Sequence, residues 1–115
     1  VERYDLGLKG QPIVLPWKYP DAYSAHHLYV VKIDESKTSR TRKEVFLQLR
    51  SNGIGVNVHY IPVHTQPFHA AAGFRAGDFP VAEKYYAGAI TLPLYYGLAD
   101  EQQDAVMERV REALS

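Results

Sequence analysis

The chain has 115 residues, of which 46% are hydrophobic. This is long enough to enclose one hydrophobic core and too short for two ordinary domains. Its 13 basic and 13 acidic residues cancel, which argues against nucleic acid or an anionic membrane as a partner, since both are bound through an excess of positive charge. The absence of cysteine rules out disulfides and a cysteine nucleophile and favours a reducing compartment, so we expect a cytoplasmic protein. No apolar run approaches the roughly 20 residues needed to cross a bilayer, so we expect no membrane segment.

Residues 1–22 are rich in glycine and proline, with Gly7, Gly10, Pro12, Pro16 and Pro20. Proline removes a backbone donor and fixes the chain in extended or turn conformations. We therefore predict that 1–22 is an extended connecting arm from a preceding large domain. The chain does not begin with methionine, and we expect it to be a piece of a longer protein. Residues 23–115 are predicted to form one small domain.

In the first half of that domain, the sequence predicts a strand, a helix and a second strand. Residues 28–33 are almost continuously apolar and rich in β-branched and aromatic side chains, as a buried strand requires. Thr41 and Glu44 have the spacing of a capping box, and the helix that they start should stop at Ser51, before Asn52-Gly53. Residues 54–60 alternate between apolar and polar side chains and predict a half-buried strand.

The second half predicts a loop over 61–77, then a helix, a short strand and a final helix. Asp78 is expected to cap the first helix, with Pro80 in its opening turn. Residues 90–94 predict a strand that Pro93 confines to an edge or an end. Asp100 and Gln103 resemble a cap at the start of the last helix. After the arm the order is β-α-β-α-β-α, which predicts the α/β class and a two-layer sandwich of helices against a sheet.

Five histidines raise the question of a metal site: His26, His27, His59, His64 and His69. Zinc ligands usually form close local pairs, and these spacings give no convergent set, so we expect no metal. No acidic residue stands beside them in the sequence to orient an imidazole. There is also no serine in a glycine-flanked elbow and no glycine-rich phosphate loop that opens a helix.

The stretch from Val58 to Pro67 is the strongest local feature, because hydrogen-bonding rings alternate with prolines where a strand ends. We interpret it as part of the wall of a polar pocket, with His59, Tyr60 and His64 as candidate substrate-binding residues. The alternative is that His59 and Tyr60 are ordinary strand residues, one solvated and one packed, and that the prolines merely stop the strand.

Four separated motifs occur together in the same order and spacing as in one known family. They are Ser24–Tyr29, Asn52–Ile54 with His59–Pro67, Gly77–Glu83, and Thr91–Leu94. Over residues 14–114 the chain resembles the C-terminal third of the DegT/DnrJ/EryC1/StrS aminotransferases, and within them the branch that aminates UDP-linked 4-keto-6-deoxy-N-acetyl sugars on the way to pseudaminic acid.

This resemblance implies the small C-terminal domain of a fold-type I enzyme that uses pyridoxal 5'-phosphate (PLP). Such an enzyme moves an amino group from glutamate to a nucleotide-linked keto sugar, works as a homodimer, and carries its Schiff-base lysine in the large domain. None of the six lysines matches the family's lysine motif, so we assign no catalytic residue and expect the chain to be inactive alone, without bound cofactor. His27 matches the family's histidine before the first strand, and Ser24 and His27 are expected to be structural or adjacent to the active site.

Two other classes of function stay open on the sequence. Small α/β sandwiches also occur as free-standing modules that bind small molecules without catalysis. A pure assembly domain, which pairs with another chain through exposed apolar surface, is a third possibility.

Overall fold

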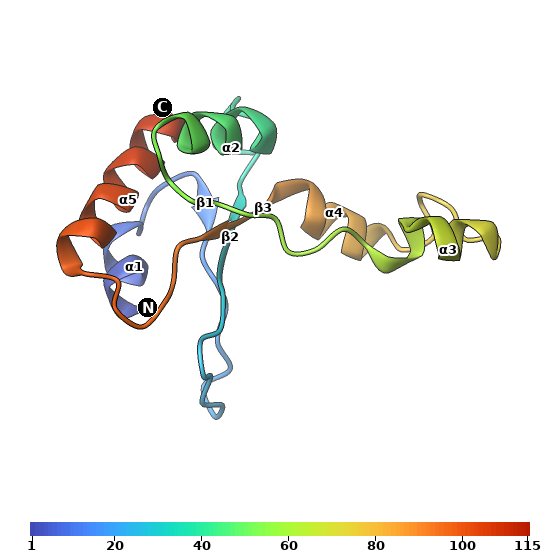
Figure 1. Ribbon diagram of the computed structural model, residues 1–115, viewed down its shortest axis with the longest axis horizontal. Helices are drawn as coiled ribbons and strands as arrows, with labels where there is room; N and C mark the ends of the chain where they lie inside the picture. Colours follow the sequence, from blue (N-terminus) through green and yellow to red (C-terminus); the bar gives the residue numbers. More distant parts are fainter.

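The computed structural model describes all 115 residues and has helices packed on a three-stranded sheet. The elements are α1 (Glu2–Gly7), β1 (Ile13–Val14), β2 (Tyr29–Ile33), α2 (Arg42–Ser51), the 3-10 turn η1 (Val63–Thr65), α3 (Pro67–Ala71), α4 (Pro80–Gly88), β3 (Ala89–Leu92) and α5 (Asp100–Leu114). The strands lie in the order β1-β2-β3, and both pairs are antiparallel. Helices α1, α2 and α5 lie together on one side of the sheet (Figure 1), so the predicted two-layer α/β class is confirmed.

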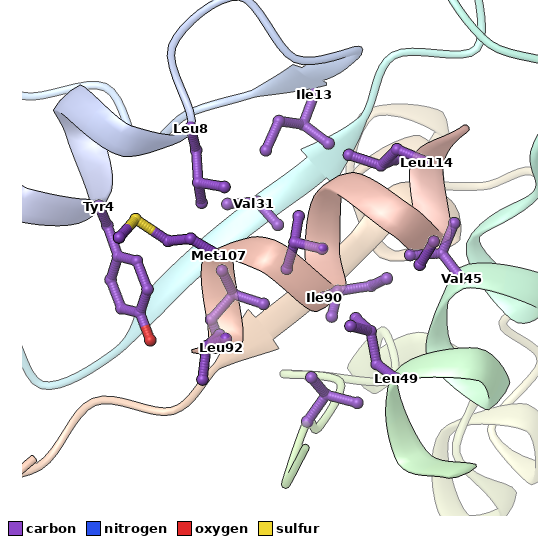
Figure 2. Close-up of a cluster of buried hydrophobic side chains, with 14 of the residues drawn as sticks. Tyr4, Leu8, Ile13, Val31, Val45, Leu49, Ile90, Leu92, Met107 and Leu114 are labelled. Carbon is purple, nitrogen blue, oxygen red and sulfur yellow. The ribbon is translucent and has the colours of Figure 1, made fainter. Parts of the chain in front are cut away.

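Alternation along β2 determines which face of the sheet is covered. Tyr29, Val31 and Ile33 are buried, whereas the intervening Val30 and Lys32 are only partly covered. The buried side chains meet Val45 and Leu49 of α2 and the apolar stripe of α5 in a cluster of 16 buried residues (Figure 2). Burial of this apolar surface is the main source of stability.

The helix starts show how far local sequence rules hold. The predicted capping box at Thr41 is confirmed, because its hydroxyl accepts from the Glu44 amide and the Glu44 carboxylate accepts from the Thr41 amide. The caps expected at Asp78 and Asp100 are wrong. Asp78 accepts from the Arg75 amide, and α4 starts after Phe79 without a side-chain cap. Helix α5 starts after Ala99, whose amide donates to the side chain of Gln102 at 3.0 Å. The expected partner, Gln103, is buried instead.

The extended conformation predicted for 1–22 is wrong for its first half. Tyr4 and Leu8, four residues apart, both have no exposed surface because α1 packs against α5. Ile13 then pairs with Ile33 in β1. The helical signal is this single apolar pair, and the neighbouring glycines obscure it. The predicted boundary at residue 22 and the role of 1–22 as a connection to a preceding domain stay predictions.

The strand predicted over 54–60 is also wrong. Asn57 alone pairs with the sheet, through its amide to the Thr91 carbonyl at 3.2 Å and from the Thr91 amide to its carbonyl at 2.8 Å. Val56 is buried as the alternation predicted, but the chain then leaves β3. A single bridged pair cannot count as a strand, so the observed order is α-β-β-α-α-α-β-α.

A polar network ties α1 to the sheet beneath the core. The rings of Tyr4 and Tyr29 lie 4.8 Å apart, and their hydroxyls donate to the Pro93 carbonyl at 2.9 Å and to Asp5 Oδ1 at 2.7 Å. Lys18 donates to the other oxygen of Asp5 at 2.8 Å. Burial raises the pKa of Tyr29, and the Asp5 carboxylate raises it further.

Residues 60–88, hereafter the projection, extend away from the sheet and carry η1, α3 and α4 (Figure 1). The radius of gyration is 15.4 Å, against about 13 Å expected for a compact chain of this length. Every residue from 70 to 82 is exposed. None of the helices is long and apolar enough to cross a bilayer.

Candidate functional site

His59 and Tyr60 lie where the chain leaves the sheet to form the projection. His59 Nδ1 is 2.8 Å from the Thr91 hydroxyl, and Thr91 is buried on β3, so the imidazole is fixed to the sheet. The His59 and Tyr60 rings meet edge to face with centroids 4.5 Å apart. The Tyr60 side chain is 67% exposed and its hydroxyl makes no hydrogen bond within the chain. Tyr60 therefore has a hydroxyl and a ring face that a ligand can reach.

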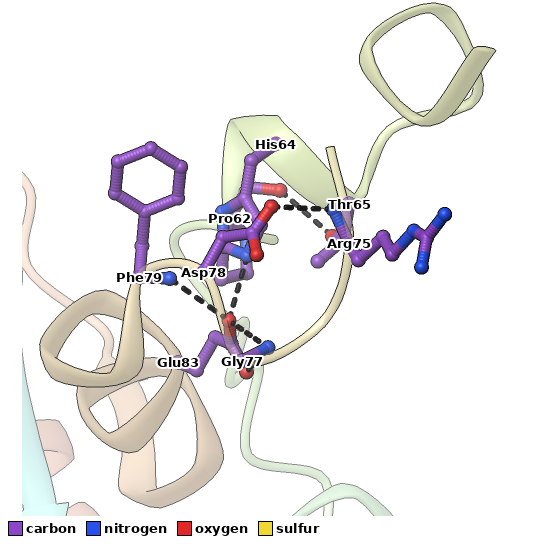
Figure 3. Close-up of polar contacts among 8 residues, drawn as sticks. All are labelled: Pro62, His64, Thr65, Arg75, Gly77, Asp78, Phe79 and Glu83. Carbon is purple, nitrogen blue, oxygen red and sulfur yellow. Dashed lines mark hydrogen bonds and ion pairs between the residues drawn. The ribbon is translucent and has the colours of Figure 1, made fainter. Parts of the chain in front are cut away.

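His64 has a different environment, because its ring is buried and one of its nitrogens is already engaged. Nε2 is 2.7 Å from Glu83 Oε1 (Figure 3). The Glu83 carboxylate also accepts from the Gly77 amide at 2.8 and 3.0 Å and from the Phe79 amide at 3.4 Å. The Gly77 amide, and after it the His64 ring, lowers the pKa of Glu83. An ionised carboxylate can only accept a hydrogen bond, so Nε2 is the donor to Glu83.

Glu83 corrects the expectation that the histidines have no acidic partner. It lies on α4, 19 residues from His64 and beyond α3, so proximity in the sequence could not reveal the pair. Its place in the motif Gly77–Glu83 was the available signal, but nothing in the sequence showed which side chain it meets.

A hollow opens between the start of the projection and α4. One side is formed by Tyr60 and Pro62, and the other by Phe79, Val81 and Tyr85. Asp78, Pro80 and Ala82 complete the lining, and the volume is about 610 Å³. We call this site the aromatic hollow. Aromatic and apolar walls suit a ring that has one apolar face and hydroxyl groups at its edge.

Ser24 and His27 lie elsewhere, in the connection between β1 and β2. Both are exposed, and Ser24 Oγ accepts from the His26 amide at 3.1 Å, which is a local turn. No hydrogen bond or ring contact joins them to His59, Tyr60 or His64. The structure thus brings His59 and Tyr60 together, fixes His64 nearby against α4, and leaves Ser24 and His27 separate.

The lysines of the chain do not provide a Schiff-base site. Lys18 and Lys37 are each paired with an aspartate, at 2.8 and 2.9 Å. Lys9, Lys43 and Lys84 are exposed, and Lys32 is partly covered on β2. A lysine that forms a Schiff base is activated by removal from water or by neighbouring cations. These residues therefore do not fit a complete PLP site by themselves. No three histidine or acidic side chains converge as metal ligands either.

Comparison with known proteins decides the family. The model of the DegT/DnrJ/EryC1/StrS aminotransferase family matches residues 1–111. The chain belongs to this family. This DegT/DnrJ/EryC1/StrS chain is 38% identical over 113 residues to the spore coat polysaccharide biosynthesis protein SpsC of Bacillus subtilis. The matched region covers 96% of the chain and 29% of SpsC.

Solved structures of DegT/DnrJ/EryC1/StrS proteins and their relatives have the same fold. Spr1654 of Streptococcus pneumoniae, in its PMP form, superposes with a TM-score of 0.88 at 29% identity, over 97% of this chain and 28% of that one. PseC of Helicobacter pylori, an aminotransferase of pseudoaminic acid biosynthesis, superposes with a TM-score of 0.86 over 98% of this chain and 30% of that one. At 23% identity, the likeness to PseC shows the fold alone. The chain spans less than a third of the length of these relatives.

Proposed function

We propose that this chain is the small C-terminal domain of a PLP-dependent transaminase that moves an amino group from glutamate to a nucleotide-linked 4-keto-6-deoxy sugar. The observation that carries the proposal is the family match over residues 1–111. The lysines described above give the chain no Schiff-base group of its own, so in this proposal the cofactor is held by another domain and the chain alone is inactive. PLP, when bound there, supplies the chemistry of amino transfer.

In this proposal the chain supplies one wall of the sugar pocket. Tyr60 offers a free hydroxyl and ring face, and its position is fixed by the neighbouring His59, which is bound to Thr91. The aromatic hollow has the volume for a sugar ring, about 610 Å³. His64, four residues after Tyr60, is also proposed to belong to this wall, and its Nε2 is bound to Glu83. Ser24 and His27, on the β1–β2 connection, are proposed to contact another part of the enzyme.

The finer parts of the proposal come from the resemblance of the four motifs. They are the UDP-linked N-acetyl sugar of the pseudaminic acid branch, a homodimeric assembly and a cytoplasmic location. Assembly has additional support in the exposed large apolar side chains of the projection, such as Phe68 at 80% and Val81 at 84% exposure, because surfaces of this kind mark sites of contact with other protein.

The first test is to express the whole reading frame that contains this chain and to follow the two half-reactions separately. Glutamate alone should convert the PLP absorbance to that of PMP, and a UDP-linked 4-keto-6-deoxy sugar should restore it. The 115-residue chain alone should do neither. A reading frame that encodes no PLP-binding domain, or a full-length protein without the glutamate half-reaction, would refute the proposal and favour a non-catalytic binding or assembly module.

A further inference from the structure

The segment that carries His64 has few hydrogen bonds to the rest of the molecule, and its ring contacts outside the segment are those of His64 and Phe74 with Phe79. The hydrogen bonds of residues 61–74 join members of the same segment, such as the amide of Thr65 to the carbonyl of Pro62 and that of Phe74 to the carbonyl of His69. The exception is the bond between His64 and Glu83 at 2.7 Å. This bond is the polar link between the segment and α4.

Glu83 joins three points of the projection through one carboxylate. One of its oxygens, Oε1, is bound to the His64 ring and to the Gly77 and Phe79 amides (Figure 3). The His64 and Phe79 rings also lie 4.8 Å apart. The incoming segment, the turn before α4 and α4 itself are therefore fixed relative to one another at a single side chain.

Tyr60 lies between two fixed points of the chain. On one side the neighbouring His59 is bound to Thr91, and on the other, four residues later, His64 is bound to Glu83. The aromatic hollow has one wall on this stretch and the other on α4. The distance between the two walls therefore depends on the bond between His64 and Glu83.

We propose that Glu83 is a positioning residue for the sugar site: acting through His64, it fixes Tyr60 and thereby the width of the aromatic hollow. This inference rests on the proposed function for its substrate, and on the described geometry for the fixation itself. Glu83 does not contact the reacting atoms in this proposal. Its loss should weaken binding of the keto sugar and leave the reaction with glutamate unchanged.

The test compares Glu83→Ala with Glu44→Ala in the complete enzyme that carries this chain. Glu44 is a matched control, since it too is a glutamate that accepts a backbone amide at a helix start, 2.8 Å from the Thr41 nitrogen. Hydrogen exchange of single backbone amides, measured by NMR, shows how firmly the segment around Glu83 is held in place. In Glu83→Ala the Gly77 and Phe79 amides should exchange at least about fivefold faster, because they lose a charged acceptor. Glu44→Ala should accelerate exchange only at the start of α2.

The half-reactions then show whether the fixation serves the sugar. Glu83→Ala should raise KM for the keto sugar at least about fivefold, with the rate of the glutamate half-reaction within about twofold of the unsubstituted enzyme. His64→Asn, which places its amide too far from Glu83, should have the same effect, and the double variant should be no worse than either single one. His64→Gln, whose amide nitrogen lies close to the position of Nε2, should keep the KM for the keto sugar within about twofold of that of the unsubstituted enzyme.

Unchanged exchange at Gly77 and Phe79 in Glu83→Ala would overturn the inference, whatever the kinetics. Equal losses in both half-reactions would also overturn it, because they would indicate general damage to the fold. If the unsubstituted enzyme shows no half-reaction at all, the proposed function fails, and the role of Glu83 in sugar binding fails with it. The exchange measurement is independent of this outcome and tests only whether Glu83 holds the segment in place.

Discussion

Replacing Tyr29 by phenylalanine tests the polar network under the core, because it removes one hydroxyl and leaves the ring in place. The hydroxyl donates to Asp5 Oδ1 at 2.7 Å. A hydrogen bond to a charged acceptor contributes about 1.5–3 kcal/mol to stability. The Asp5 side chain is 30% exposed and keeps its bond to Lys18, so water replaces part of the lost bond. We therefore expect a loss of about 1.5 kcal/mol, or roughly 6 °C in Tm for a chain of this size.

This loss should depend on pH in a defined direction. Burial alone would raise the pKa of Asp5, but the hydrogen bonds from Lys18 and Tyr29 outweigh it and lower the pKa below 3.8. The stabilisation that accompanies a lowered pKa is present above the unfolded value and disappears as the pH falls through the folded value. The difference between the variant and the unsubstituted chain should thus be largest near neutral pH and should shrink as the pH falls through the lowered pKa of Asp5.

Urea unfolding followed by circular dichroism, at about pH 6 and about pH 2.5, measures both free energies. Tyr4→Phe is the matched control, since its hydroxyl donates to the neutral Pro93 carbonyl at 2.9 Å. Its cost should be about 1 kcal/mol and should be the same at both pH values. A Tyr29→Phe loss that is equally large at both pH values would refute the assigned role of Asp5.

Three further substitutions test other parts of the structure. Thr41→Ala removes the cap of α2 and should cost about 1 kcal/mol in urea unfolding; no loss would mean that the capping box contributes nothing. Gly7→Ala places a methyl group against the sulfur of the buried Met107, whose side chain must shift. The overpacking should outweigh the roughly 0.5–1 kcal/mol that alanine gains over glycine in a helix and leave a net loss of about 1 kcal/mol; a neutral result would show that Met107 moves freely. His59→Ala removes the bond to Thr91 and should slow sugar turnover in the complete enzyme more than the glutamate half-reaction; equal loss in both would indicate damage to the fold.

The elements that sequence predicted correctly are those whose local pattern agrees with their burial. In the strand beginning at Tyr29 the apolar run is packed under helices, and the helix beginning at Thr41 has a complete capping box. The segment from Ile54 to Tyr60 alternates as a strand does, yet only Asn57 meets β3. A strand forms only where two segments pair. The alternation within one segment could not show that its partner, β3, lies beside it at one residue only.

The sequence proposed residues for the candidate site but not the contacts that they make. The histidine and proline pattern singled out His59, Tyr60 and His64, whose part in substrate binding stays a prediction, and the structure shows that the rings of the first two are in contact. The partners Thr91 and Glu83 lie 32 and 19 residues away from the histidines that they bind. Only the turn made by the projection brings them close, and no local rule describes it.

Helix α4 continues into β3 without a loop, since Gly88 ends the one and Ala89 begins the other. Glu83 and Thr91 therefore lie on one continuous run of regular structure, and each binds one of two histidines that are themselves only five positions apart. The four residues close a ring made partly of covalent chain and partly of hydrogen bonds. In a library with both His64 and Glu83 randomised, selection for sugar turnover should retain pairs in which a hydrogen-bond donor faces an acceptor. The residues at the two positions should therefore covary.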